Sequence, residues 1–126
     1  MCDENRKENF EPLNGDDILQ KIKSIKFSSW NYKTQNPKVQ RHYGIMAQDF
    51  FHAFGRDKYG AIGNDTTVNP IDMIGIDMAA IQALEKRTAQ LTIENREWRM
   101  ENTKQGAAIE ELQTAIKELQ RSLLQK

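Results

Sequence analysis

Apolar residues recur in alternating steps of three and four over the last third of the chain. The a and d positions of this heptad pattern are Ile81, Leu84, Thr88, Leu91, Asn95, Trp98, Asn102, Gln105, Ile109, Leu112, Ile116, Leu119 and Leu123. The run exceeds the three or four heptads that indicate a coiled coil. A single helix of this length would rise about 65 Å, so it needs partner helices that the rest of the chain does not contain.

The seam formed by these positions is apolar at both ends and polar in the middle. Asn95, Asn102 and Gln105 occupy core positions, and Gly106 follows them. Polar core residues fix register and oligomeric state at a cost in stability. A glycine costs about 1 kcal/mol against alanine in a helix, so this segment is predicted to be locally loose.

The heptad pattern leaves the number of helices open. Isoleucines at the a positions 109 and 116, with leucine at d, suit a dimer, whereas Ala108 and Ala115 at flanking positions leave room for a trimer. The residues assigned to oligomerisation are Ile81, Leu84, Leu91, Trp98, Ile109, Leu112, Ile116, Leu119 and Leu123.

Shorter elements are predicted ahead of the seam. A turn at 14–17, with a carboxylate suited to cap a helix, precedes apolar residues at helical spacing over 18–25. A second apolar stripe covers 46–54 and stops at a glycine. Residues 69–70, an asparagine followed by a proline, are typical of a helix start.

The stretch between the two short helices predicts a β-hairpin. Aromatic residues in 26–33 suit one strand, 35–38 has turn chemistry, and 39–43 alternates like a returning strand. Glycines make 55–67 a loop, and 67–68 could form a brief strand. The expected fold is therefore α+β, a small mixed head followed by a long helix. We divide it into an N-terminal segment 1–15, a head 16–75 and a coiled-coil helix 76–126.

The composition argues against nucleic acid and membranes as partners. Acidic and basic residues are equal in number, 18 each, so no net field attracts nucleic acid or an anionic membrane. No apolar run approaches the ~20 residues that span a bilayer, and no signal peptide follows the first residue. The single cysteine permits no intrachain disulfide. We expect a soluble chain with no membrane and no nucleic-acid partner.

Familiar cofactor sites are also missing from the sequence. No glycine-rich phosphate cradle is present, so no ATP is expected, and His42 and His52 lack the spacing of a metal site. Trp30, Tyr32 and Tyr43 could stack on a base or a sugar, but a core this small needs the same aromatics. We expect no metal and no cofactor.

Candidate chemistry lies at the start of the chain. Cys2 offers a sulfur nucleophile and Lys7 an amine five residues later, close enough to meet across one turn. Such a lysine acts as a base only when neutral, which requires desolvation. Any cysteine has some lysine nearby, so the spacing alone is a weak signal.

Residues 2–12, Cys-Asp-Glu-Asn-Arg-Lys-Glu-Asn-Phe-Glu-Pro, resemble the opening Ser-Asp-Arg-Asn-x-Lys-Glu-Asn-Phe of the endosialidase-type intramolecular chaperone domain. That domain lies at the C-terminus of phage tailspikes, tail fibres and neck appendages. The stretches 29–33, 41–55 and 76–84 agree with it in the same order. The resemblance thus covers nearly the whole chain.

The resemblance implies a parallel homotrimeric coiled coil that helps an upstream β-rich fibre to fold and then cuts itself off. The family uses a serine nucleophile and a lysine base, which fall on Cys2 and Lys7. The cysteine could act as the nucleophile or alter cleavage, and in another register Met1 replaces a native serine. The bond between Met1 and Cys2 is the expected cleavage site, so a released domain begins at about this point. The implied activity is single-turnover self-cleavage, not that of a free-standing enzyme.

These implications place the protein in the host cell cytoplasm during virion assembly, with the released chaperone absent from the mature particle. Two alternatives stay open. The chain could be a permanent structural trimerisation element, or a fibre tip that binds the host surface through Trp30 and neighbouring aromatics.

Overall fold

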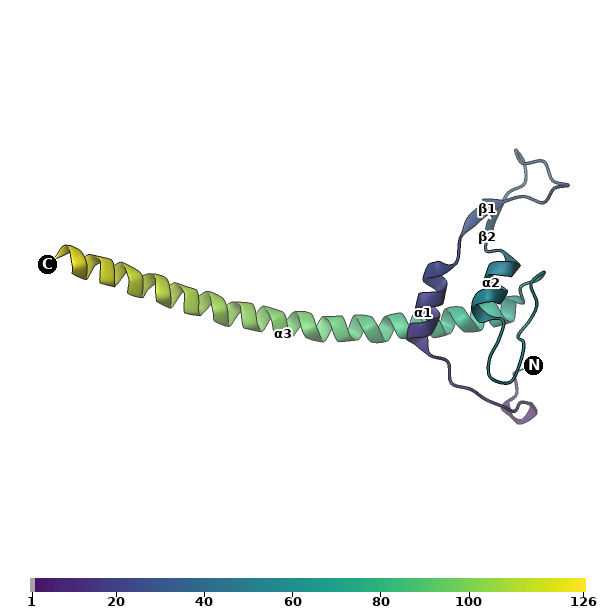
Figure 1. Cartoon of the computed structure of the whole chain (residues 1–126), viewed down its shortest axis with the longest axis horizontal. Coiled ribbons are helices and arrows are strands. Elements are labelled where there is room, and N and C mark those ends of the chain that lie inside the picture. Colours follow the sequence, from purple (N-terminus) through teal and green to yellow (C-terminus); the bar gives the residue numbers. More distant parts are fainter. Residues whose placement is uncertain (1) are drawn as a thin grey trace. The chain divides into compact units, whose positions relative to one another are not determined.

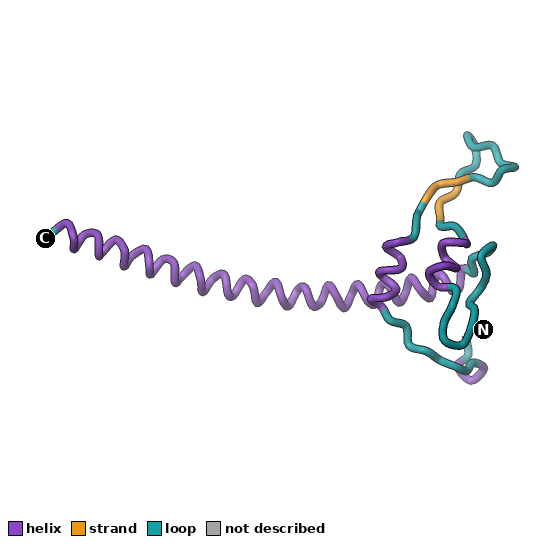
Figure 2. Tube along the Cα trace, in the orientation of Figure 1, coloured by secondary structure: helices purple, strands orange, loops and turns teal. Residues whose placement is uncertain are grey.

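A computed structural model of the protein describes residues 2–126. The chain divides into two compact units, Met1–Leu84 and Glu85–Lys126. The elements are η1 (Glu4–Arg6), α1 (Gly15–Ser24), β1 (Ser28–Trp30), β2 (His42–Gly44), α2 (Ala47–Phe54) and α3 (Pro70–Leu124). A two-stranded antiparallel hairpin and a long C-terminal helix confirm the α+β class (Figure 1, Figure 2).

Helix α1 begins as the sequence predicts, but with a different capping group. The side-chain oxygen of Asn14 accepts a hydrogen bond of 3.1 Å from the backbone N–H of Asp17. The predicted cap was a carboxylate, whereas the observed cap is an amide. Asp17 instead forms an ion pair of 2.9 Å with Lys21, one turn further along the same helix.

The predicted hairpin is confirmed, with shorter strands than expected. Its register pairs Ser28 with Gly44 and Trp30 with His42. Residues 39–41 do not join the returning strand, so that part of the prediction is wrong. The backbone N–H groups of residues 39 and 40 both donate to the carbonyl of Asn36 at 3.0 Å, which closes a turn instead.

A small core holds the first unit together. Ile18, Phe54 and Ala80 are its buried residues, one each from α1, α2 and the first part of α3. The half-buried residues packed around them are Leu19, Ile22, Ile25, Phe50, Ala53, Ile76 and Ala79. Helix α2 ends, as predicted, at Gly55, whose N–H donates to the Phe51 carbonyl at 2.8 Å.

The start of α3 also follows the sequence-based prediction. Pro70 is its first residue, and the side-chain oxygen of Asn69 accepts a 2.9 Å hydrogen bond from the N–H of Ile71. The helix therefore includes residues 70–75, which our division of the chain assigned to the head. The brief strand expected at 67–68 is absent, because the Asn64 side chain accepts from the N–H groups of residues 66 and 67 at 2.9 Å.

The hairpin aromatics do not fill the core, contrary to expectation. Tyr32 is 58% exposed and Tyr43 is 90% exposed. Trp30 is half-buried, and its ring packs against those of Tyr32 and His42, with centroids 4.9 and 4.7 Å away. These rings form a separate cluster on the hairpin.

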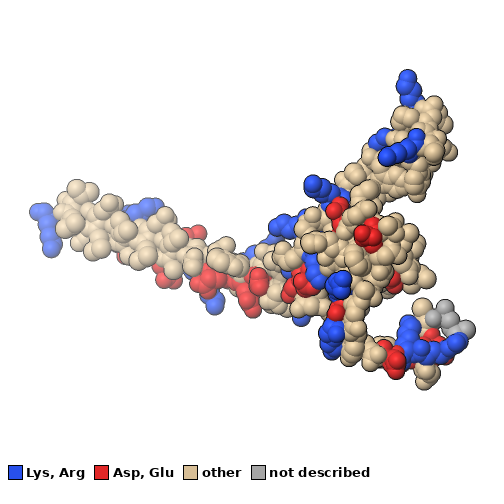
Figure 3. Space-filling view, turned by 45° about the vertical axis from the view of Figure 1, so that its right-hand side comes forward, with Lys and Arg blue, Asp and Glu red and all other residues tan. Residues whose placement is uncertain are grey.

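The seam of α3 is uncovered. Every residue from 84 to 126 is exposed, and each apolar residue assigned to oligomerisation exposes more than half of its surface. Acidic and basic side chains are interspersed along the helix (Figure 3). No helix within residues 2–126 combines the length and apolar character needed to cross a membrane.

We expect Gly15→Ala to lower the free energy of unfolding by about 1–3 kcal/mol, because its new methyl group would overpack the interface with α3. A Cβ at Gly15 would lie 2.6 Å from the Cβ of Ala83. Gly75→Ala is the matched control. Nothing lies within 4 Å of a Cβ there, and alanine should stabilise that helix by about 1 kcal/mol. Urea unfolding followed by circular dichroism measures both, and equal effects would contradict this packing.

Candidate functional site

One short turn links the two residues of the predicted dyad. Cys2 precedes η1, and Lys7 follows it directly. The carboxylate of Asp3 caps the turn by accepting from the Asn5 N–H at 3.0 Å, and the Lys7 N–H donates to the Glu4 carbonyl at 3.0 Å. The backbone between the candidate nucleophile and the candidate base is therefore a defined turn.

The site is open in the single chain. Cys2 and Lys7 are both exposed. A lysine side chain takes a proton from a thiol only in its neutral form, which burial favours. The single chain covers neither group. Met1, the other side of the predicted cleavage point, lies outside the described residues.

Few contacts anchor the segment that carries the dyad. Phe10 and Leu13 are its large apolar residues, and they are 62% and 61% exposed. The Glu11 carboxylate lies 3.6 Å from the Lys58 ammonium, an ion pair between this segment and the loop that follows α2. Both side chains are partly exposed, so the pair contributes at most about 1 kcal/mol.

A second candidate surface is the aromatic cluster on the hairpin. The oxygen of the Gln35 side chain accepts from the Tyr32 N–H at 2.9 Å and lies 3.1 Å from His42 Nε2. The indole Nε1 of Trp30 is buried and has no hydrogen-bond partner among residues 2–126. An exposed aromatic face beside polar groups can stack on a sugar ring.

Arg41 holds the two strands of the hairpin in place. Its guanidinium donates to the Asn31 side chain at 2.9 Å and to the carbonyl and hydroxyl of Ser29 at 3.0 and 2.9 Å. Sequence analysis missed this role and that of Gln35. Contacts that cross a hairpin have no periodic signal, so the strand pattern and turn chemistry predicted the hairpin but not these contacts.

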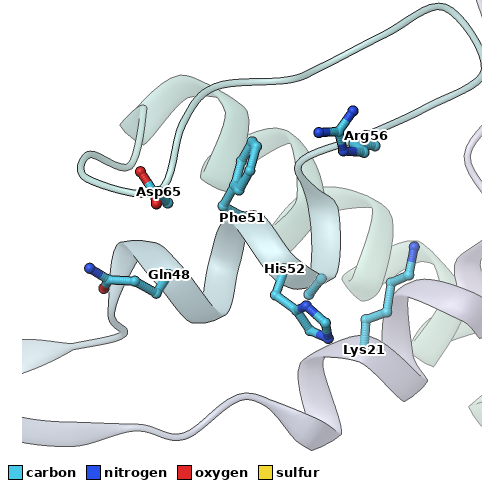
Figure 4. A pocket seen from close by; sticks show the side chains of 7 residues that line it. Lys21, Gln48, Phe51, His52, Arg56 and Asp65 are labelled. Carbon is cyan, nitrogen blue, oxygen red and sulfur yellow. The ribbon is translucent and has the colours of Figure 1, made fainter.

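An open depression of about 600 Å³ lies beside α2 (Figure 4). Lys21, His52 and Arg56 gather on one side of it, and Gln48 and Asp65 lie on the other. Mixed charges of this kind could hold the side chain of a polar partner. The lining contains no thiol or hydroxyl nucleophile.

Metal-binding chemistry is not evident in the part of the chain that the structure describes. Within residues 2–126, no three His, Cys, Asp or Glu side chains lie close enough together to hold an ion. His42 lies on β2 beside Trp30 and Gln35, and His52 lies on α2 at the edge of the depression. Both elements are as predicted.

A family model described as chaperone of endosialidase matches residues 2–56. Residues 2–56 are therefore similar to the chaperone-of-endosialidase family, and the resemblance found in the sequence is confirmed for this part of the chain. The match includes both dyad positions, α1, the hairpin and α2, and it stops before α3. Comparison with curated proteins finds no match.

We expect the thiol of Cys2 to react with a maleimide as fast in the native protein as in the urea-unfolded protein, because the side chain is exposed. The chain has one cysteine, so the labelling rate reports on this residue alone. Intact mass against time measures it. A native rate far below the unfolded rate would show that Cys2 is covered in the isolated protein.

Proposed function

We propose that this protein is an intramolecular chaperone that trimerises through α3, assists an upstream phage fibre, tailspike or neck appendage, and is then released by autoproteolysis. The family match supports the chaperone role. The observation that carries the rest is the seam of α3, whose apolar side chains are more than half exposed along one stripe. Exposed apolar surface of this extent is typical of an interaction site.

The physical benefit of trimerisation is alignment. Trimeric β-rich fibres depend on non-local contacts between chains, so they assemble slowly and expose unpaired edges meanwhile. A coiled coil at one end makes the later encounters effectively intramolecular, at about millimolar effective concentration for a short tether. Association supplies the driving force, so this mechanism uses no ATP, metal or cofactor.

Release would follow as one round of acyl transfer. Lys7 takes the proton of the Cys2 thiol, and the sulfur adds to the carbonyl carbon of residue 1. The C–N bond then breaks as Lys7 returns the proton to the departing amine of Cys2, which leaves a thioester on that sulfur. Water then adds to the carbonyl carbon of the thioester, the C–S bond breaks, and the sulfur of Cys2 takes back a proton.

The products are an upstream carboxylate and a domain that begins with the free amine and free thiol of Cys2. Because Cys2 and Lys7 are exposed in the single chain, the covering that desolvates the lysine comes from assembly of the precursor with its upstream fibre. Cleavage therefore follows trimer formation. This order retains the template until the fibre is built, after which slow unfolding keeps the fibre intact. The process belongs to the host cytoplasm during virion assembly, and the released domain is absent from the mature particle.

The exposed hairpin favours a second candidate function. Tyr32 and Tyr43 present aromatic surface beside Trp30, which suits a fibre tip that binds host sugars. In that case, or if α3 is a permanent trimerisation element, the domain stays on the particle. Retention on purified particles would favour these functions over a released chaperone.

We expect Lys7→Ala to abolish release from a precursor that carries the upstream fibre sequence, while leaving the precursor trimeric. Lys23→Ala, which changes an exposed lysine on α1, is the matched control and should be cut normally. Cys2→Ser tests the nucleophile and should still be cut, since serine is the family residue. Intact mass of the purified products identifies the new terminus. Clean release from the Lys7→Ala precursor would refute the dyad.

We expect Ile116→Asp to convert the trimer to monomer at micromolar concentration, because the change places a charge in the apolar half of the seam. Lys117→Asp is the control, because Lys117 lies at a b position, which is outside the seam. Sedimentation equilibrium of the full chain measures both. A trimer that tolerates aspartate at position 116 would show that the seam is assigned to the wrong face.

A further inference from the structure

The polar middle of α3 carries a shallow acidic groove. Glu94, Glu97, Trp98 and Glu101 line an open space of about 350 Å³ on this part of the helix. The indole of Trp98 is 67% exposed. Carboxylates around an exposed indole suit a guanidinium, which can pair with a carboxylate and stack on the ring.

The heptad positions identify which guanidinium could enter this groove. In a parallel coiled coil, a residue at g lies beside the e residue five positions later in the neighbouring chain. The g–e pairs of this sequence are Arg87–Thr92, Glu94–Arg99, Glu101–Gly106, Ala108–Gln113 and Ala115–Gln120. Glu94 with Arg99 is the one pair of opposite charges among them.

Contacts within the helix leave this pair free to form between chains. One oxygen of Glu94 accepts from Gln90 Nε2 at 2.9 Å, and the other oxygen remains available. Arg99 contributes its backbone carbonyl to Thr103 at 2.9 Å. No hydrogen bond or ion pair holds the Arg99 guanidinium within the described chain.

We propose that the groove is the docking site for Arg99 of a second copy of this chain, in a parallel bundle with zero stagger. The inference rests on the proposed trimer and names the contact that sets its register. The guanidinium of the neighbouring copy lies between the Glu94 carboxylate and the face of Trp98. Trp98 is a d residue, and its hole in the facing helix is bounded by the a and e positions on which Asn95, Arg99 and Asn102 stand.

The core asparagines favour the same register. With zero stagger, each asparagine faces its own equivalent, and the amides can bond to one another. A shift of one heptad places Asn102 against Ile109, where an unpaired amide costs about 1–3 kcal/mol. The same shift places Arg87 beside Arg99 on one side of the interface. A shifted ring of three chains also fails to close.

The register of the helices in the polar middle of α3 sets how the chains upstream of the bundle are aligned. A slip of one heptad displaces one helix by about 10 Å along its neighbour. Any chain upstream would then be offset by the same amount. The apolar ends of the seam tolerate such a slip, since leucine and isoleucine repeat there at each heptad. The polar middle is where register can be specified.

Charge exchange on the full chain tests the contact. Glu94→Arg and Arg99→Glu should each weaken trimer formation by about tenfold, and the double exchange should restore it. Arg96→Glu with Glu110→Arg is the matched control, since both residues lie at b positions and the same charges are exchanged. Sedimentation equilibrium at low and high salt measures association, and the loss in the single variants should shrink in high salt.

The outcomes separate this inference from the proposed function. A wild-type trimer whose association ignores both single changes, or is not restored by the double exchange, overturns the Arg99 contact and leaves the trimer standing. A wild-type chain that stays monomeric overturns the trimer and this contact together. Restoration by the double exchange, with the control unchanged, supports both.

Discussion

A row of apolar side chains that the chain cannot cover is the constraint on which this structure depends. The head buries Ile18, Phe54 and Ala80, whereas the apolar side chains of the seam are more than half exposed. An isolated helix gains little stability from its own backbone, and most helices in proteins are stabilised by packing of an apolar face. If α3 associates as proposed, the stability of the distal helix depends on association, and so on protein concentration.

Local chemistry explains which elements could be predicted. The end of α2 at Gly55 and the start of α3 at Pro70 each depend on residues within one turn, so their sequence patterns sufficed. Predictions failed where a polar group competed for the backbone: Asn64 and Asn36 take the N–H groups that the expected strand residues needed. The prediction that the hairpin aromatics fill the core failed for another reason, because Trp30 packs against Tyr32 and His42 on the hairpin instead.

In the candidate sites too, some features could be predicted from the sequence and others could not. Cys2 and Lys7 came from a resemblance that the family match supports, and their roles remain predictions. The structure adds the turn that joins them. The contact between Glu11 and Lys58 had no signature in the sequence, because an ion pair between distant segments follows no spacing rule. The family match thus lies in residues 2–56, and the exposed apolar seam lies in the helix beyond the matched region.

The uneven distribution of apolar residues along α3 also bears on the order of synthesis. The strongest part of the seam, from Ile109 to Leu123, follows the head and the polar middle in the sequence. A ribosome therefore makes the head before it makes the part that would recruit other chains in the proposed trimer. A nascent chain that stops before residue 109 carries the family domain without that part of the seam. In the proposed trimer, the position of these few isoleucines and leucines would favour association of chains that already contain the head.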